Sequence, residues 1–283
     1  MKGWLGFGDR LETLKMAVDY CQKNNVKIYV DWKDSMWSHG EESFYTYFKL
    51  INVPQIASLD EIPADATVYP EFWKDKLDTP LSKDIVEKHS DYKIDIGVLK
   101  GTYNYDVVVL SNVGHRLLFP DSSFFGNVLR VIDDRIINKV KDRQQRYKLS
   151  SAIGVHVRGS DRVTETKRAI RIQWLATHVT MTGGLNGTPI VVVSDDKKSL
   201  EIWKRFYPSS TILSELALEQ SSSKGNHNLS GDALKFTKDQ MNVDCLVDFF
   251  TLASTMRIQT SEKDSRFAQE AARLHSYVNK ILG

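Results

Sequence analysis

The stretch Ile153-Gly154-Val155-His156-Val157-Arg158-Gly159-Ser160-Asp161-Arg162 decides the fold and indicates a site. Residues 152–157 form a short apolar run rich in β-branched side chains, which is typical of a strand buried on both faces. His156 and Arg158 are two residues apart, so both side chains leave the same face of that strand. A glycine and a polar turn follow at once. An open α/β sheet binds ligands beyond the carboxyl ends of its strands, so this turn is a candidate binding site.

Arg158 suits a phosphate, because a guanidinium group offers planar, bidentate hydrogen-bond donors. A structural interpretation competes with this one. Arg158 could form a salt bridge at the strand end, and His156 could have its hydrogen bonds satisfied in the core. The motif alone does not decide between them, since charged constellations are only probabilistic markers of sites.

The chain after this strand alternates helices with strands. Helices are expected over residues 168–181, 198–206, 239–255 and from a cap at 261–264 to 282; strands are expected over 190–193, 211–213 and 256–260. Residues 219–232, rich in Ser, Gly and Asn, predict a loop. Strands separated by helices of this length form a parallel sheet.

The first half begins with Gly6-Phe7-Gly8-Asp9-Arg10, followed by a predicted helix over 11–24 and a strand over 26–30. A Gly-x-Gly turn that opens a helix lets an anion approach the helix N-terminus. No third glycine follows at dinucleotide spacing, which argues against a Rossmann-type oxidoreductase. In the structural interpretation, Asp9 pairs with Arg10 or caps the helix.

Further strands are predicted at residues 68–70 and 106–112. Residues 127–146 predict an amphipathic helix, whose charges we expect to form a solvated face. With 283 residues, the chain is long enough for two domains. We therefore expect an α/β protein with two Rossmann-like domains, 1–148 and 149–283, facing each other across a cleft.

The glycine turn and His156-x-Arg158 together resemble the fucosyltransferase superfamily. That superfamily includes the nodulation fucosyltransferases, the core α1,6-fucosyltransferases and the protein O-fucosyltransferases. The stretches Val30-Asp31-Trp32-Lys33-Asp34-Ser35 and Phe44-Tyr45-Thr46-Tyr47-Phe48 are most similar to the nodulation enzymes. The resemblance implies the GT-B fold of glycosyltransferases, with the acceptor on the first domain and the nucleotide sugar on the second.

The resemblance also implies roles for single residues. In that family the Arg of the His-x-Arg motif stabilises the leaving phosphate, which falls on Arg158 here, and His156 would position the donor. Arg162 is a candidate for a second cation. Gly159 stands where the core α1,6-fucosyltransferases carry a second Arg. This departure puts GDP-fucose in doubt as the donor but leaves nucleotide-sugar chemistry intact. Asp9 and Asp161 are the candidates for the base that deprotonates the acceptor.

The remaining donor contacts are predicted at strand ends and on the last helices. The full donor-binding set is His156, Arg158, Ser194, Asp195, Asp248, Ser261, Ser265 and Arg266, and the acceptor or phosphate loop is Gly6, Gly8 and Arg10. Asp195 and Asp196 could instead be a metal pair, although a helix N-cap is favoured. Asp244 and Asp248 could lie on a solvated helix face. Ser261, in capping-box spacing with Asp264, and Ser265 could be simple caps.

Composition narrows the function classes. The net charge of +2, with 41% hydrophobic and 26% charged residues, is too balanced for a nucleic-acid or membrane surface. No run of about 18 apolar residues exists, so no transmembrane helix is expected. Cys21 and Cys245 are too few and too far apart for a disulfide framework or a metal site. We expect a cytoplasmic protein without a signal peptide, metal or cofactor.

The predicted function is that of an inverting, metal-independent glycosyltransferase. It would move a sugar from a nucleotide-sugar donor, by default GDP-fucose, to a hydroxyl of an oligosaccharide or other glycan. One alternative keeps the class but changes the donor, to UDP-xylose or a rhamnosyl nucleotide, since a fold does not specify the sugar. Another alternative is a non-catalytic glycan- or nucleotide-binding protein, which would be expected to lose the cation at the leaving phosphate.

Overall fold

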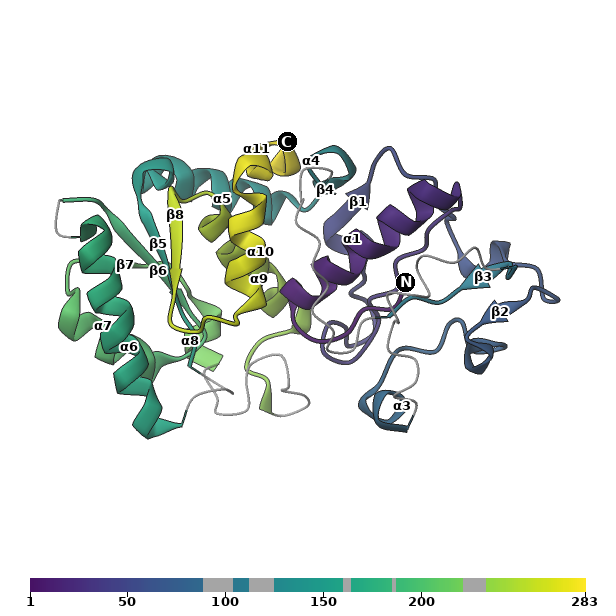
Figure 1. The fold of residues 1–283 in the computed structure, drawn as a ribbon, viewed down its shortest axis with the longest axis horizontal. Helices are drawn as coiled ribbons and strands as arrows, with labels where there is room; N and C mark the ends of the chain where they lie inside the picture. Colours follow the sequence, from purple (N-terminus) through teal and green to yellow (C-terminus); the bar gives the residue numbers. More distant parts are fainter. Residues whose placement is uncertain (89–103, 112–124, 160–163, 185–186, 221–232) are drawn as a thin grey trace. The chain divides into compact units, whose positions relative to one another are not determined.

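A computed structural model describes the chain except for residues 89–103, 112–124, 160–163, 185–186 and 221–232. The described chain divides into two compact units, Met1–Arg130 and Val131–Gly283 (Figure 1). The sequence placed this boundary between residues 148 and 149. The boundary falls earlier because helix α5 (Asp134–Arg146) packs against α9 (Lys238–Ala253) of the second unit.

The first unit begins with helix α1 (Phe7–Asn24), which starts four residues earlier than predicted. Gly6 is its N-cap and Gly8 already lies in its first turn, so the glycines do not form a separate loop. The early start follows from packing: the Phe7 ring stacks on Trp37 and Phe48, with centroids 6.0 Å and 5.7 Å away.

The other elements of the first unit are short. They are α2 (Phe44–Tyr47), β1 (Phe48–Leu50), β2 (Val68–Tyr69), α3 (Lys83–Lys88), β3 (Val107–Val108), α4 (Phe125–Val128), β4 (Leu129–Val131) and two single 3₁₀ turns, Leu59–Glu61 and Glu71–Trp73. The strand predicted over 26–30 does not form. Ile28 and Asp31 make only isolated parallel bridges, to Gln55 and Lys2. β2 and β3 pair in parallel, as their predicted strand segments allow.

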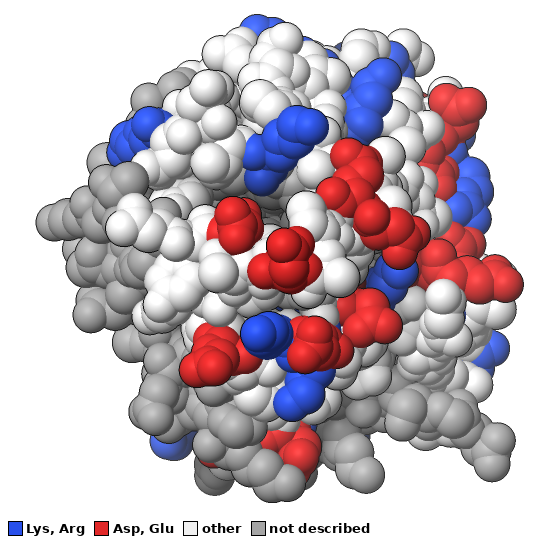
Figure 2. Space-filling model, turned by 90° about the vertical axis from the view of Figure 1, so that its right-hand side faces the viewer, with Lys and Arg blue, Asp and Glu red and all other residues white. Residues whose placement is uncertain are grey.

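Charged side chains of both signs are mixed on the side of the molecule that lies on the right in Figure 1. Figure 2 shows this side, with Asp and Glu side chains lying next to Lys and Arg. A surface that binds the phosphate backbone of a nucleic acid carries clustered Lys and Arg instead. Among the helices that the structure describes, none is long and apolar enough to cross a bilayer.

The second unit contains a four-stranded sheet in the order β7-β6-β5-β8. The strands are β5 (Ile153–Val157), β6 (Ile190–Ser194), β7 (Thr211–Ile212) and β8 (Arg257–Thr260). Every neighbouring pair is parallel, which confirms the predicted α/β class and parallel sheet. His156 lies opposite Val193 on one side and Thr260 on the other.

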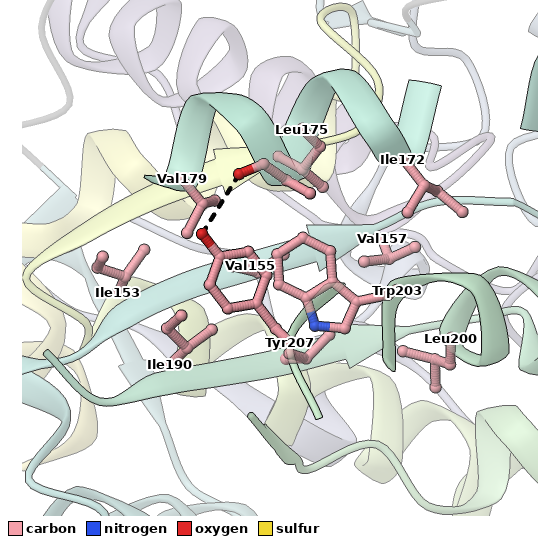
Figure 3. Close-up of a cluster of buried hydrophobic side chains, with 12 residues drawn as sticks. Ile153, Val155, Val157, Ile172, Leu175, Val179, Ile190, Leu200, Trp203 and Tyr207 are labelled. Atoms are coloured by element: carbon pink, nitrogen blue, oxygen red, sulfur yellow. Dashed lines mark hydrogen bonds between the residues drawn. The ribbon is translucent and has the colours of Figure 1, made fainter. Parts of the chain in front are cut away.

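The two faces of this sheet carry different helices (Figure 1). Helices α6 (Glu165–Val179) and α7 (Lys197–Phe206) cover one face, and α9 and α10 (Arg266–Leu274) cover the other. Figure 3 shows Val155 and Val157 of β5 pointing into the first layer, where they pack with Trp203 and Tyr207. Because side chains alternate along a strand, Gly154 and His156 face α9 and α10.

Two more predicted helices differ from the observed ones, and one observed helix was not predicted. Residues 127–146 are interrupted by β4, which pairs with β1, and α5 begins only after its N-cap Asp133. The last helix begins after Ser265 rather than at 261–264 and is broken by a 3₁₀ turn before α11 (Val278–Leu282). A short helix, α8 (Leu216–Gln220), overlaps the start of the loop predicted over 219–232, most of which lies outside the described residues.

Candidate functional site

The candidate site lies at the carboxyl edge of the second unit's sheet. β5 continues through α6, on one face, to β6, whereas β8 continues into α10 on the opposite face. Neighbouring strands whose connections leave toward opposite faces form a topological switch point, and ligands of open α/β sheets bind in the crevice outside it. Arg158 and Ser261 are the first residues after β5 and β8, so both lie at this point.

His156 is buried at this edge, with 6% of its surface exposed. Its Nδ1 lies 3.2 Å from the Thr260 hydroxyl and 3.3 Å from the Ser265 hydroxyl. Burial lowers the pKa of His156 to about 4; Asp195 opposes this shift and Arg158 adds to it. The imidazole is therefore neutral at physiological pH, and it contacts the hydroxyls of Thr260 and Ser265 without carrying a positive charge.

The burial of His156 makes stability depend on pH. Because the folded-state pKa of His156 is depressed, the contribution of the neutral imidazole to the free energy of unfolding is fully present above about pH 6.5. It is lost as the pH falls toward 4. At about pH 4.5 the loss amounts to about 2–3 kcal/mol of unfolding free energy. His156→Asn keeps a polar group near the two hydroxyls but does not titrate. Urea unfolding of both proteins across this range should give a steeper acid decline for the wild type; parallel curves would contradict the assignment.

The backbone at Arg158 is bonded from both neighbouring strands. The Arg158 N–H donates to the Ser261 hydroxyl at 2.9 Å, and that hydroxyl donates to the Arg158 carbonyl at 3.2 Å. From the β6 side, Asp195 Oδ1 accepts the Gly159 N–H at 3.1 Å. Arg158 is itself partly exposed at this edge, although its Nε is buried.

Gly159 has a packing reason for carrying no side chain. A Cβ added there would clash with the Ser199 hydroxyl and with the Asp196 carboxylate. The start of α7 therefore approaches the backbone at Gly159 directly. This explains in physical terms why the second Arg of the core α1,6-fucosyltransferase pattern is absent from this position.

The segment after β6 holds the strand ends together. The Ser194 hydroxyl donates to the Val157 carbonyl at 2.6 Å and accepts the Asp196 N–H at 3.1 Å. Asp196 is the N-cap of α7, as favoured from the sequence, and its carboxylate also pairs with Arg168 Nε at 3.1 Å. Ser194 and Asp196 thus have structural contacts, and donor binding by Ser194 stays a prediction.

Asp244 and Asp248 do not lie on a solvated face, because 4% and 6% of their surfaces are exposed. Asp248 accepts hydrogen bonds from Arg143 Nη1, at 2.9 Å, and from the Ser214 hydroxyl. Burial raises the pKa of Asp248 to about 7, Asp244 raises it further, and Arg143 and Ser214 oppose the shift. Arg143 is also buried, so the expectation that the charges of residues 127–146 are all solvated was wrong.

The last helix supplies the remaining predicted contacts. Ser265 is the N-cap of α10 and accepts the Ala268 N–H at 3.4 Å. Arg266, the first residue of that helix, is partly exposed. Ser261 caps no helix, and its hydroxyl bonds the backbone of Arg158 instead. Donor contact by these three residues stays a prediction.

Arg10 and Asp9, two of the predicted site residues of the first unit, differ in burial and contacts. Arg10 is fully buried, and its two terminal nitrogens each donate to Asp34 at 2.7 Å. Its guanidinium also lies over the rings of Trp32 and Trp37. These contacts give Arg10 a structural role inside the unit and do not support its predicted place in a phosphate loop. Asp9 is partly exposed in the first turn of α1.

The structure thus brings together His156, Arg158, Asp195, Ser261 and Ser265 at one sheet edge. Asp161 and Arg162 lie outside the described residues. Sequence reasoning missed the hydroxyls of Thr260 and Ser214, although a Ser or Thr at or directly after a buried strand is a readable signal for such contacts.

Two further features bear on ligands. A cavity of about 450 Å³ is lined by residues 187–190 and 206–210, at the amino end of β6 and therefore at the opposite edge of the sheet. Within the described part of the chain, no group of three or more His, Cys, Asp or Glu side chains is placed to hold a metal ion. Both cysteines are free thiols.

Comparison with known proteins adds to this geometry. No family model and no curated protein matches the sequence. Among solved structures, fucosyltransferase NodZ from Bradyrhizobium matches with a TM-score of 0.66 at 15% identity, over 94% of this chain and 88% of that one. This chain therefore has the same fold as NodZ. That fold is of the GT-B type, so the predicted fold class is confirmed, and the resemblance noted from the motifs is confirmed at the level of the fold.

Two other NodZ structures give similar matches. One is described as the α-1,6-fucosyltransferase co-crystallised with GDP, with a TM-score of 0.66 at 16% identity. The other is described as soaked with GDP-fucose, with a TM-score of 0.65 at 16% identity over 95% of this chain and 89% of that one.

Proposed function

We propose that this protein is a glycosyltransferase that uses a nucleotide-sugar donor. The observation that carries the proposal is the placement of Arg158 at the β5/β8 switch point of a chain with the NodZ fold. A departing nucleoside diphosphate gains negative charge as the sugar bond breaks. A preorganised cation at that position stabilises the charge, which is often the largest single contribution to catalysis.

The default donor is GDP-fucose. NodZ structures are described with GDP and with GDP-fucose, and the fold is shared. Because Gly159 replaces the second Arg of the core α1,6-fucosyltransferases, a different donor, such as UDP-xylose or a rhamnosyl nucleotide, is the alternative. A non-catalytic binding protein on the same scaffold is the other class, and the presence of a partly exposed Arg158 argues against it.

The reaction we propose is inverting and independent of metal. In such a reaction a base takes the proton of the acceptor hydroxyl, which attacks the sugar carbon as the diphosphate leaves with the bonding electrons. Asp9 and Asp161 remain the candidate bases, and the acceptor would be a glycan. Asp196 is committed to the cap of α7 and to Arg168, which supports a role other than metal binding. Two free thiols fit a reducing, cytoplasmic setting.

A thermal-shift panel of nucleotides and nucleotide sugars tests the proposal, because a ligand that binds the folded state raises the melting temperature by an amount that grows with the ratio of its concentration to its Kd. We expect GDP and GDP-fucose to stabilise the protein. Stabilisation by UDP compounds alone would identify a UDP-sugar as the donor instead. Stabilisation by none of the compounds would contradict the proposal. Sugar transfer to a glycan acceptor with EDTA present is expected to persist; its loss, with rescue by Mn²⁺ or Mg²⁺, would overturn metal independence.

A further inference from the structure

The peptide of Arg158 is bonded on both sides by side chains of the neighbouring strand ends. Ser261 bonds the Arg158 N–H and carbonyl from the β8 side, and Asp195 bonds the next N–H from the β6 side. Regular strand pairing between β5 and β8 ends at His156, opposite Thr260. The Ser261 hydroxyl therefore continues the pairing for one residue beyond the sheet.

The backbone of Ser261 is also hydrogen-bonded to β5. Its own N–H donates to the His156 carbonyl at 3.0 Å, so its backbone keeps the register of β8 against β5. The only hydrogen that its hydroxyl can donate goes to the Arg158 carbonyl, and one of its lone pairs accepts the Arg158 N–H. A donor-sugar phosphate would accept hydrogen bonds, yet this hydroxyl has no second hydrogen to give it.

We propose that Ser261, predicted from the sequence to contact the donor, is instead a positioning residue that acts through Arg158. This rests on the proposed function, because it assumes that Arg158 meets the diphosphate. Its hydroxyl holds the backbone at the point where Arg158 leaves the sheet, and so limits where the guanidinium can lie. Small displacements of such a group are costly, since charge stabilisation depends on a preset geometry.

A double-mutant cycle on GDP binding distinguishes a Ser261 that positions Arg158 from a Ser261 that contacts the nucleotide. Titration calorimetry would measure the Kd of the wild type, Ser261→Ala, Arg158→Ala and the double variant. We expect Ser261→Ala to weaken binding about tenfold when Arg158 is present and by less than about twofold when it is absent. An equal loss in both backgrounds would show direct contact with the nucleotide and overturn the proposal, as would no loss in either.

Two further variants control for general damage. Ser261→Thr keeps the hydroxyl and is expected to restore the wild-type Kd. Ser151→Ala removes another serine hydroxyl that donates to a backbone carbonyl, that of Lys148, at the opposite end of β5. It should leave GDP binding unchanged.

Amide hydrogen exchange provides a readout that needs no ligand. Loss of the Ser261 hydroxyl should speed exchange of the Arg158 N–H about tenfold or more, with no such change in Ser261→Thr or Ser151→Ala. Unchanged exchange in Ser261→Ala would overturn the proposal. Wild-type protein that binds no nucleotide would contradict the proposed function instead, and the exchange rate would then decide alone whether Ser261 holds Arg158.

Discussion

Arg158→Ala is expected to lower kcat for sugar transfer by roughly a hundredfold or more, the usual cost of removing one preorganised charge-stabilising group. The reason is that the diphosphate carries more charge in the transition state than in the bound donor, so Arg158 contributes more there. Arg158→Lys should restore little, because an ammonium group cannot reproduce the bidentate fork. GDP binding should weaken as well, since the product carries the same charge.

Steady-state kinetics and melting temperatures, measured on the same preparations, check this result. Arg205→Ala is the matched control, because Arg205 is an exposed arginine in the last turn of α7, within the same unit. It should leave kcat unchanged. If Arg158→Ala melts early yet keeps normal specific activity at low temperature, Arg158 is a structural residue and the site lies elsewhere.

Arg143→Met is expected to cost about 3–5 kcal/mol of unfolding free energy, because it leaves a buried carboxylate without its cation. Arg143 donates to Asp248 at 2.9 Å and to the Thr251 hydroxyl at 3.1 Å, and it is itself buried. The folded-state pKa of Asp248 is raised to about 7, so ionised Asp248 is costly above that pH. The loss should therefore be larger at about pH 8 than at about pH 5.5, where Asp248 can protonate.

Urea unfolding at the two pH values measures this effect. Arg146→Met is the control on the same helix, because Arg146 is exposed and pairs with Asp142 one turn away. Surface pairs of this kind contribute about 0–1 kcal/mol. Adding Asp248→Asn to Arg143→Met should recover part of the loss. Equal losses for the two arginine variants would contradict the importance of the buried pair.

The second unit was predictable because its two central strands, β5 and β6, are buried on both faces. An apolar run such as Ile190–Ser194 has few alternatives to a strand inside a parallel sheet, and the helices between such runs specify the connections. The glycine and polar turn that follow His156-x-Arg158 likewise predicted that both residues lie at the carboxyl end of β5. The structure adds the order of the strands, and with it the switch point between β5 and β8.

The first unit was less predictable because its strands are very short. The apolar run predicted as a strand over 26–30 forms only one bridge, between Ile28 and Gln55, and β2 keeps two of the three residues predicted over 68–70. The helix predicted over 127–146 is interrupted by another short strand, β4. Three residues of β4 pair with a strand far away in the chain, and tertiary contacts of this kind override local helix patterning.

Buried charges could not be predicted because their partners are distant. The basic residues of α5 look alike in the sequence, yet Arg143 pairs with Asp248 across 105 positions. Arg10 pairs with Asp34 across 24 positions, and only that pairing shows that it is internal. Spacing indicates which side chains share a helix face, but it does not indicate what covers that face.

Photoaffinity labelling with an azido derivative of GDP, followed by peptide mapping, tests most directly whether the nucleotide binds at the carboxyl edge of the second unit's sheet. The account predicts labelled peptides within residues 149–283, with labelling suppressed by unmodified GDP and reduced in Arg158→Ala. Specific labelling confined to residues 1–145 would contradict it.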